Sequence, residues 1–112
     1  MSESDTDVPT VSVHDLRGLL AGGATVVDVR EQDEWETARV PGVLLLPLAE
    51  LPVRLSEIPP AGRVYMVCAT GGRSQRAAQY LRAGGLDAVN VEGGTSGWIE
   101  AGYEVESGPA PG

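Results

Sequence analysis

The sequence predicts an α/β fold in which a parallel sheet carries helices on both faces. Three observations indicate this fold. Short apolar runs rich in β-branched residues recur along the chain, segments with helical spacing of their apolar residues separate these runs, and glycines or prolines stand at most junctions. Strands that alternate with helices in this way form parallel sheets covered by helices. The chain has 112 residues, the length of one domain, and its 42% hydrophobic residues are enough to form a buried core.

The first predicted helix covers residues 12–23. Ser12 takes the position of an N-cap, Asp15 follows three residues later as in a near capping box, and two glycines end the segment. The apolar side of this short helix is formed by Leu16, Leu19 and Leu20.

Two predicted strands flank an acidic segment in the first half of the chain. The run TVVDVR at 25–30 is apolar and β-branched and predicts a buried strand, and VLLLPL at 43–48 predicts a second strand that Pro47 stops. Residues 31–40 predict a short acidic helix, which the Pro-Gly turn at 41–42 separates from the second strand.

The second half shows the same alternation. RVYMVC at 63–68 and DAVNV at 87–91 predict the third and fourth strands, and SQRAAQYLRAGG at 74–85 between them predicts the clearest helix of the chain. Residues 49–60 are interrupted by proline and predict a weak helix or two turns.

The ends of the domain follow from composition. A last short helix begins at Thr95 or Ser96, either of which can cap it. We expect one domain over residues 10–106, with a flexible acidic tail at 1–9 and a flexible C-terminal tail at 107–112.

The charge balance disfavours several classes of partner. Sixteen acidic residues against eight basic ones give a net charge of −8, so we expect no nucleic-acid and no membrane partner. All eight basic residues are arginine, which leaves no lysine for a Schiff base or a P-loop. The one cysteine excludes an internal disulfide, a CxxC redox pair and a thiolate-rich zinc site, so we expect no metal.

The compartment is predicted from the same features. The first ten residues are polar and acidic, unlike a secretory signal, and the longest apolar run is too short to cross a bilayer. A lone cysteine fits a reducing compartment, so we expect a cytoplasmic protein. Arginine without lysine is typical of a GC-rich bacterial genome.

The position of the single cysteine favours a reactive thiolate over an inert, buried side chain. Cys68 ends the third predicted strand, and ligands of open parallel sheets bind at the carboxyl ends of strands. The residues that follow let successive backbone N–H groups turn toward one point, while a helix start near Ser74 and the charge of Arg73 favour the thiolate. An inert buried cysteine is the alternative. The predicted anion-binding loop comprises Ala69, Thr70, Gly71, Gly72, Arg73 and Ser74.

Three stretches, in this order, resemble the rhodanese-like sulfurtransferase domain. VVDVREQDEWETARVPGVLLLPL is similar to the family's strand, acidic stretch, Pro-Gly turn and second strand, VCATGGRS to its active loop, and VEGGTSGWIEAGYEV to its closing segment. The resemblance implies a five-stranded, mainly parallel sheet with helices on both faces, in which TVSV at 10–13 supplies the remaining strand.

The resemblance also implies a reaction. Cys68 would attack the outer sulfur of thiosulfate or of a persulfide donor, carry that sulfur as a persulfide, and pass it to cyanide or a thiol, with no cofactor. A sulfur-relay protein is a further candidate partner, and we expect a monomer or a weak dimer. Arg73 matches the family arginine that holds the loop or the donor, a salt bridge at the helix start being the alternative. Ser74 either donates toward the sulfur or caps the helix, and we expect the cap.

Departures from the family pattern concern the donor. Ala69 stands where many members carry a basic residue, so thiosulfate, a dianion, is expected to bind modestly and persulfide donors become candidates. The family often has a histidine before the Pro-Gly turn, where this chain has Arg39 and Val40, and we assign Arg39 no catalytic role.

Other residues have two open interpretations. Asp28 and Arg30 end a strand at the same sheet edge as Cys68, where they form a pair that braces the loop or orients the donor, or else a helix cap and a solvated arginine. Gly93 and Gly94 either shape the rim of the site or form a plain turn. We expect the two tryptophans, Trp35 and Trp98, in the core.

Two other functions compete with sulfur transfer. A cysteine phosphatase or arsenate reductase also uses a cysteine, a ring of N–H groups and an arginine. That pattern needs five residues between cysteine and arginine, whereas four separate Cys68 from Arg73. The second rival is a non-catalytic or regulatory interaction module of the same fold, against which the retained cysteine argues.

Overall fold

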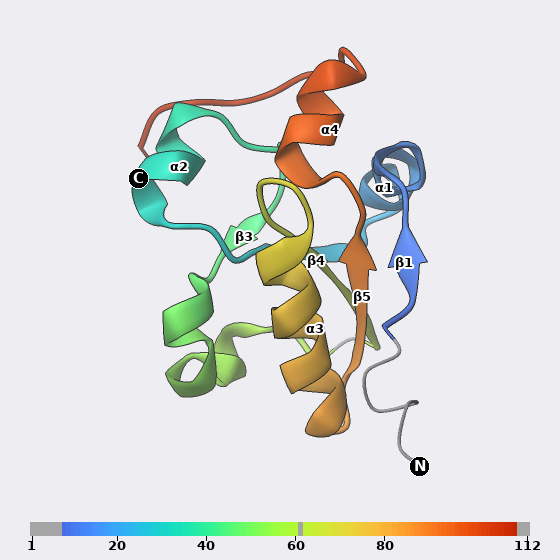
Figure 1. Cartoon of the computed structure of the whole chain (residues 1–112), viewed down its shortest axis with the longest axis vertical. Coiled ribbons are helices and arrows are strands. Elements are labelled where there is room, and N and C mark those ends of the chain that lie inside the picture. The colour runs from blue at the N-terminus through green and yellow to red at the C-terminus, as the bar shows by residue number, and fades with distance from the viewer. Residues whose placement is uncertain (1–7, 61, 110–112) are drawn as a thin grey trace.

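A computed structural model describes residues 8–60 and 62–109, which form a parallel sheet with helices on both faces (Figure 1). The sheet has five strands in the order β1-β5-β4-β2-β3, and every neighbouring pair is parallel. The predicted fold class is therefore confirmed. The strands are β1 (Thr10–Val11), β2 (Thr25–Asp28), β3 (Leu44–Leu45), β4 (Arg63–Val67) and β5 (Asp87–Val91).

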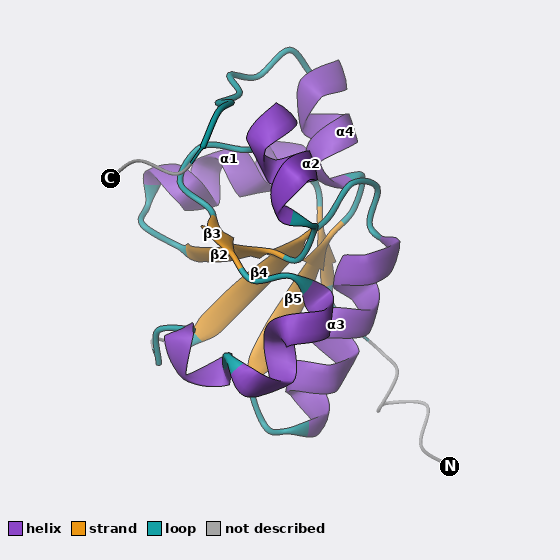
Figure 2. Ribbon diagram, turned by 90° about the vertical axis from the view of Figure 1, so that its left-hand side faces the viewer, coloured by secondary structure: helices purple, strands orange, loops and turns teal. Residues whose placement is uncertain are grey.

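The helices form one layer on each side of the sheet, and α2 lies beyond one end of it (Figure 2). α3 packs on one face together with the two short 3₁₀ helices, and α1 and α4 pack on the other. Their bounds are α1 (Val13–Ala21), α2 (Gln32–Thr37), η2 (Leu48–Val53), η3 (Leu55–Glu57), α3 (Gly72–Ala83) and α4 (Gly94–Glu100).

The central strand β4 shows how the two cores divide the side chains. Val64 and Met66 point to the core beneath α3, and Tyr65 and Val67 point to the core beneath α1 and α4. This alternation is the period-two pattern of a strand buried on both faces. Cys68 directly follows and belongs to the α3 side.

Local sequence signals explain the ends of several elements. The capping box predicted for the first helix is confirmed, because Ser12 Oγ accepts from Asp15 N at 3.0 Å while Asp15 Oδ2 accepts from Ser12 N at 3.2 Å. The second predicted strand is shorter than expected, since Pro47 has no N–H to offer a ladder. The proline-interrupted stretch after it becomes η2 and η3.

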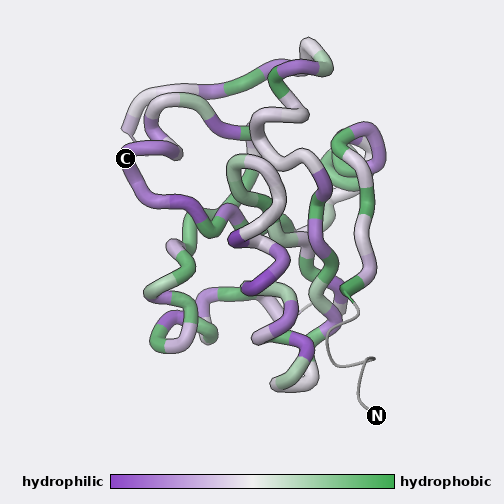
Figure 3. Tube along the Cα trace, viewed as in Figure 1, coloured by the Kyte–Doolittle hydropathy of each residue, from purple (hydrophilic) through white to green (hydrophobic). Residues whose placement is uncertain are grey.

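One edge of the sheet collects the polar elements. Because all strands are parallel, β2, β4 and β5 end at the same edge, and α2, α3 and α4 begin there (Figure 1). The segment leading into α2 and the first turn of α3 are among the most hydrophilic parts of the trace (Figure 3). This edge is where a polar site can form without disturbing the core.

The two ends of the described chain touch this body. Pro9 O accepts from Asn90 N at 2.9 Å, and Gly108 N donates to Glu36 O at 2.7 Å. Residues 1–7 and 110–112 of the predicted tails lie outside the described residues, and the domain limits stay a prediction. Within 8–60 and 62–109, no helix combines the length and apolarity that a membrane span requires.

Candidate active site

Cys68 follows β4 at the polar edge, and α3 starts earlier than the sequence indicated. The helix begins at Gly72, two residues before Ser74, with Gly71 as its N-cap at φ +117°. A φ in this range is easy only for glycine, so Gly71 lets the chain turn from the strand straight into the helix. The expected cap at Ser74 is therefore wrong.

The sulfur of Cys68 lies in a pocket of hydrogen-bond donors. Gly71 N donates to Sγ at 3.1 Å, and Ser74 Oγ donates to it at 3.3 Å. Burial acts to raise the pKa of Cys68, but hydrogen bonds from the Ser74 hydroxyl and from the backbone N–H groups of Ser74, Gly71 and Thr70 outweigh it. The pKa of the thiol is therefore lowered, as expected for a reactive cysteine.

Ser74 is tied to a residue that the sequence analysis missed. Its hydroxyl oxygen also lies 2.5 Å from Asn90 Oδ1, which is an alternative acceptor for the same proton, while Asn90 Nδ2 donates to Gly71 O at 3.3 Å. Ser74 is fully buried and Asn90 nearly so. Asn90 therefore fixes both the serine and the glycine that contact the sulfur. The signal in the sequence was a lone asparagine inside an apolar strand.

The start of α4 holds the loop from the other side. Thr95 N donates to Cys68 O at 2.8 Å, and Ser96 N donates to Ala69 O at 2.9 Å. The predicted caps are wrong, because α4 begins at Gly94 with Gly93 as N-cap.

Gly94 is required by a close approach and not by a plain turn. A Cβ at this position would lie 2.3 Å from Cys68 O and 2.8 Å from Ala69 O. Of the two interpretations of the Gly-Gly pair, the structure favours the one in which it shapes the site.

Asp28 and Arg30 form a buried ion pair, and the solvated-arginine interpretation is wrong. Arg30 Nε and Nη2 donate to the carboxylate of Asp28 at 2.9–3.1 Å, and the side chains are 6% and 0% exposed. Arg30 also donates to Glu34 O and Ala38 O, so the pair braces α2 and the residues after it.

Arg73 is engaged by a carboxylate that the sequence analysis did not identify. Arg73 Nη1 and Nη2 donate to Glu34 Oε1 and Oε2 at 2.7 and 2.9 Å. These hydrogen bonds, helped by one from Glu31 N, lower the pKa of Glu34 to about 2 against a smaller opposing effect of burial. Of the alternatives for Arg73, the structure shows the salt bridge. Glu34 lies three residues after the N-cap Glu31, and this capping-box spacing is the signal in the sequence that points to Glu34.

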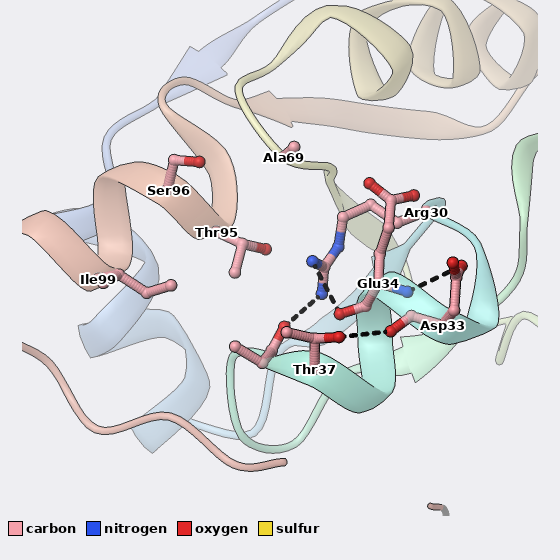
Figure 4. A pocket seen from close by; sticks show the side chains of 9 residues that line it. Arg30, Asp33, Glu34, Thr37, Ala69, Thr95, Ser96 and Ile99 are labelled. Atoms are coloured by element: carbon pink, nitrogen blue, oxygen red, sulfur yellow. Dashed lines mark hydrogen bonds between the residues drawn. The ribbon is translucent and has the colours of Figure 1, made fainter. Parts of the chain in front are cut away.

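A pocket of about 340 Å³ lies beside the loop, between α2 and α4 (Figure 4). Cys68 is not among its lining residues, but Ala69 is, and the side chain of Glu34 rises along the α2 wall. The residues that line this pocket are Arg30, Asp33, Glu34, Thr37, Ala38, Ala69, Thr95, Ser96 and Ile99.

Both tryptophans, Trp35 and Trp98, are buried in the core, as predicted.

Two further observations concern possible metal ligands and the position of Arg39. Over residues 8–60 and 62–109, no group of three or more His, Cys, Asp or Glu side chains is placed to hold a metal ion. Arg39 is buried, and its guanidinium carbon lies 3.8 Å from the centroid of the Trp35 ring. Its Nη1 donates to Trp35 O and Gly108 O. These contacts give Arg39 a structural role.

Residues 12–101 match the family described as the rhodanese-like domain. The chain is 32% identical over 100 residues to a putative sulfur carrier protein of Bacillus subtilis, covering 87% of this chain and 54% of that protein. It is 36% identical over 81 residues to a sulfurtransferase of Allochromatium vinosum, covering 71% of this chain and 76% of that one. The chain thus spans about half the length of the Bacillus relative.

Solved structures share the fold. A rhodanese-related protein of Thermoplasma volcanium superposes with a TM-score of 0.81 at 33% identity, over 87% of this chain and 96% of that one. The human single-domain sulfurtransferase superposes with a TM-score of 0.70 at 32% identity, over 84% and 97% of the two chains.

Proposed function

The chain belongs to the rhodanese-like domain family of sulfurtransferases, and on that premise we propose that Cys68 carries sulfane sulfur from a donor to a thiophilic acceptor. The observation that carries this proposal is the setting of the sulfur, which accepts hydrogen bonds from Gly71 N and from the Ser74 hydroxyl. Because these contacts lower the pKa of Cys68, they favour the thiolate that the reaction needs.

Thiosulfate and cyanide serve as one donor and acceptor pair. The thiolate of Cys68 attacks the outer sulfur of thiosulfate, a new S–S bond forms, the S–S bond of the donor breaks, and sulfite leaves with its electron pair. Cyanide then attacks the terminal sulfur of the persulfide, which yields thiocyanate and restores the thiolate. Charge and electrons balance in both steps, and no external oxidant or reductant takes part.

The loop favours the intermediate electrostatically. A persulfide extends the negative charge one atom beyond Sγ, toward the backbone N–H groups and the N-terminus of α3. Cys68 is only 1% exposed and does not line the pocket beside Ala69, so a donor requires some movement of the loop to reach the sulfur. No histidine and no metal is needed for this chemistry.

A sulfur-relay protein is part of the proposal as a further exchange partner. A relative described as a sulfur carrier and another described as a sulfurtransferase support a sulfur-relay partner as donor or acceptor. A cysteine that works as a thiolate is best kept in a reducing compartment such as the cytoplasm.

Intact-protein mass spectrometry tests the proposal. We expect the protein to gain one sulfur atom on incubation with thiosulfate or with a persulfide, and to lose it on addition of cyanide or a small thiol. Cys68→Ser should remain folded by circular dichroism and gain no sulfur, because the substitution changes one atom at a loop. Sulfur transfer by that variant would contradict the mechanism. Failure of the wild type with both donors would favour the interaction module.

A further inference from the structure

The cation of the active loop already holds an anion. Arg73 makes two charge-assisted hydrogen bonds to Glu34, in the bidentate geometry that a guanidinium would offer to an oxyanion ligand. The side chains of both residues are about one-third exposed, at 36% and 33%, so the pair lies within reach of solvent. An incoming anionic donor therefore competes with Glu34 for Arg73.

The pocket wall adds to this effect. Three charged residues line the pocket: Arg30, Asp33 and Glu34. Arg30 is compensated by Asp28, to which it donates with Nε and Nη2. Asp33 is exposed and adds a carboxylate to the same wall. Because the chain as a whole carries a net charge of −8, the approach to the pocket repels dianions.

We infer that Glu34, with Asp33 beside it, sets the donor specificity of this site: it disfavours dianionic donors such as thiosulfate and favours persulfides that carry an ammonium group. This inference rests on the sulfur-transfer function proposed for Cys68. Glu34 acts by occupying Arg73 and by attracting the cationic end of the donor. It is a specificity-determining residue and takes no part in bond making.

The favoured step balances without a further reactant. The Cys68 thiolate attacks the outer sulfur of cysteamine persulfide, a new S–S bond forms, and the S–S bond of the donor breaks. Cysteamine leaves with the electron pair as a thiolate and takes up a proton from water. The persulfide on Cys68 is the same as that formed from thiosulfate, so the two donors can be compared through one product.

The test measures how fast Cys68 gains sulfur from each donor. Second-order rate constants for thiosulfate and for cysteamine persulfide are obtained from intact mass over time, for the wild type, Glu34→Gln and Glu36→Gln. Glu36 is the matched control: it lies on α2, and its carboxylate accepts from Gln32 and is absent from the pocket wall.

We expect the ratio of the thiosulfate rate constant to the persulfide rate constant to rise about tenfold in Glu34→Gln. In Glu36→Gln the ratio should change less than twofold. Should Glu34→Gln prove too unstable to assay, Asp33→Asn carries the test, with a smaller rise expected. An unchanged ratio overturns the inference. An equal rise for both donors also overturns it, because the ion pair would then merely hold the loop closed.

The experiment distinguishes a failure of the proposed function from a failure of the specificity inference. If the wild type gains no sulfur from either donor, the proposed function has failed and the specificity question does not arise. If the wild type gains sulfur and the ratio is insensitive to Glu34 and Asp33, only the specificity inference is lost.

Discussion

A single hydroxyl proton connects Cys68 to the neighbouring strand. Ser74 Oγ lies within hydrogen-bond distance of Cys68 Sγ and of Asn90 Oδ1, but it has one proton to donate. Donation to a thiolate is charge-assisted and stronger than donation to an amide oxygen. Ionisation of Cys68 therefore draws the proton toward the sulfur, and the serine stabilises the reactive form selectively.

Ser74→Ala should slow the reaction of Cys68 with iodoacetamide at neutral pH by about threefold to tenfold. The pKa of the thiol rises when a hydrogen bond to the thiolate is lost, so less thiolate is present at pH 7, and the rate recovers at alkaline pH. The pH profile of alkylation measures this effect. Ser56→Ala, an exposed serine in η3, is the control and should leave the profile in place. An unshifted profile in Ser74→Ala would assign this serine to packing alone.

Glu34 makes a second residue-scale prediction, which concerns stability and pH. Its pKa is depressed from 4.5 to about 2 in the folded state, so its contribution is present above pH 4.5 and is lost as the pH falls toward 2. Because the pair is one-third exposed, we expect a contribution of only about 1 kcal/mol. Urea denaturation of the wild type and Glu34→Gln should show this difference at pH 7 and little difference near pH 2. A difference that persists at low pH would show that the pair does not cause it.

The elements position the site through contacts between segments far apart in sequence. The sequence correctly placed Cys68 and its glycines between a strand and a helix start, because these parts are adjacent in the chain, and the binding of an anion by this loop stays a prediction. It did not predict that Asn90 fixes Ser74, or that Glu34 takes Arg73. Those contacts depend on the register of β4 against β5 and on the placement of α2, which periodicity does not determine. The caps at Ser74 and Thr95 were wrong because glycines with positive φ precede both helices and start them earlier.

Gly94→Ala tests how α4 supports the loop. The new Cβ would overlap the carbonyl oxygens of Cys68 and Ala69, so α4 or the loop must shift. We expect a loss of about 3 kcal/mol in the free energy of unfolding and slower alkylation of Cys68.

Gly102→Ala is the matched control for that experiment. Gly102 also has a positive φ, +81°, but a Cβ there would meet nothing within 4 Å. Gly102→Ala should lower the free energy of unfolding by only about 1 kcal/mol and leave the reactivity of Cys68 unchanged. Equal losses in the two variants would show that backbone strain, and not the close approach to the loop, explains the effect at Gly94.

At the scale of the whole molecule, two arginines on either side of α2 have different tasks. Arg39 joins α2 to the C-terminal segment: its backbone exchanges hydrogen bonds with Glu106, and its side chain reaches Gly108 O at 2.7 Å. Arg73 joins α2 to the active loop through Glu34. The contacts of Arg39 thus fix α2 to the C-terminal segment, and the Arg73–Glu34 ion pair connects the same helix to the active loop.

This division predicts opposite results for two substitutions of the same kind. Arg39→Met removes a buried cation from the face of Trp35 and leaves carbonyl groups without a donor, so it should lower the free energy of unfolding by about 2–3 kcal/mol. Sulfur loading per folded molecule should be retained. Arg73→Met breaks a partly exposed pair and should cost about 1 kcal/mol or less. It also removes the loop's cation and should slow loading from thiosulfate about tenfold. Urea denaturation and sulfur loading measured on both variants decide the matter: if Arg73→Met unfolds the protein while loading per folded molecule stays constant, Arg73 is structural and the loop needs no cation to accept a donor.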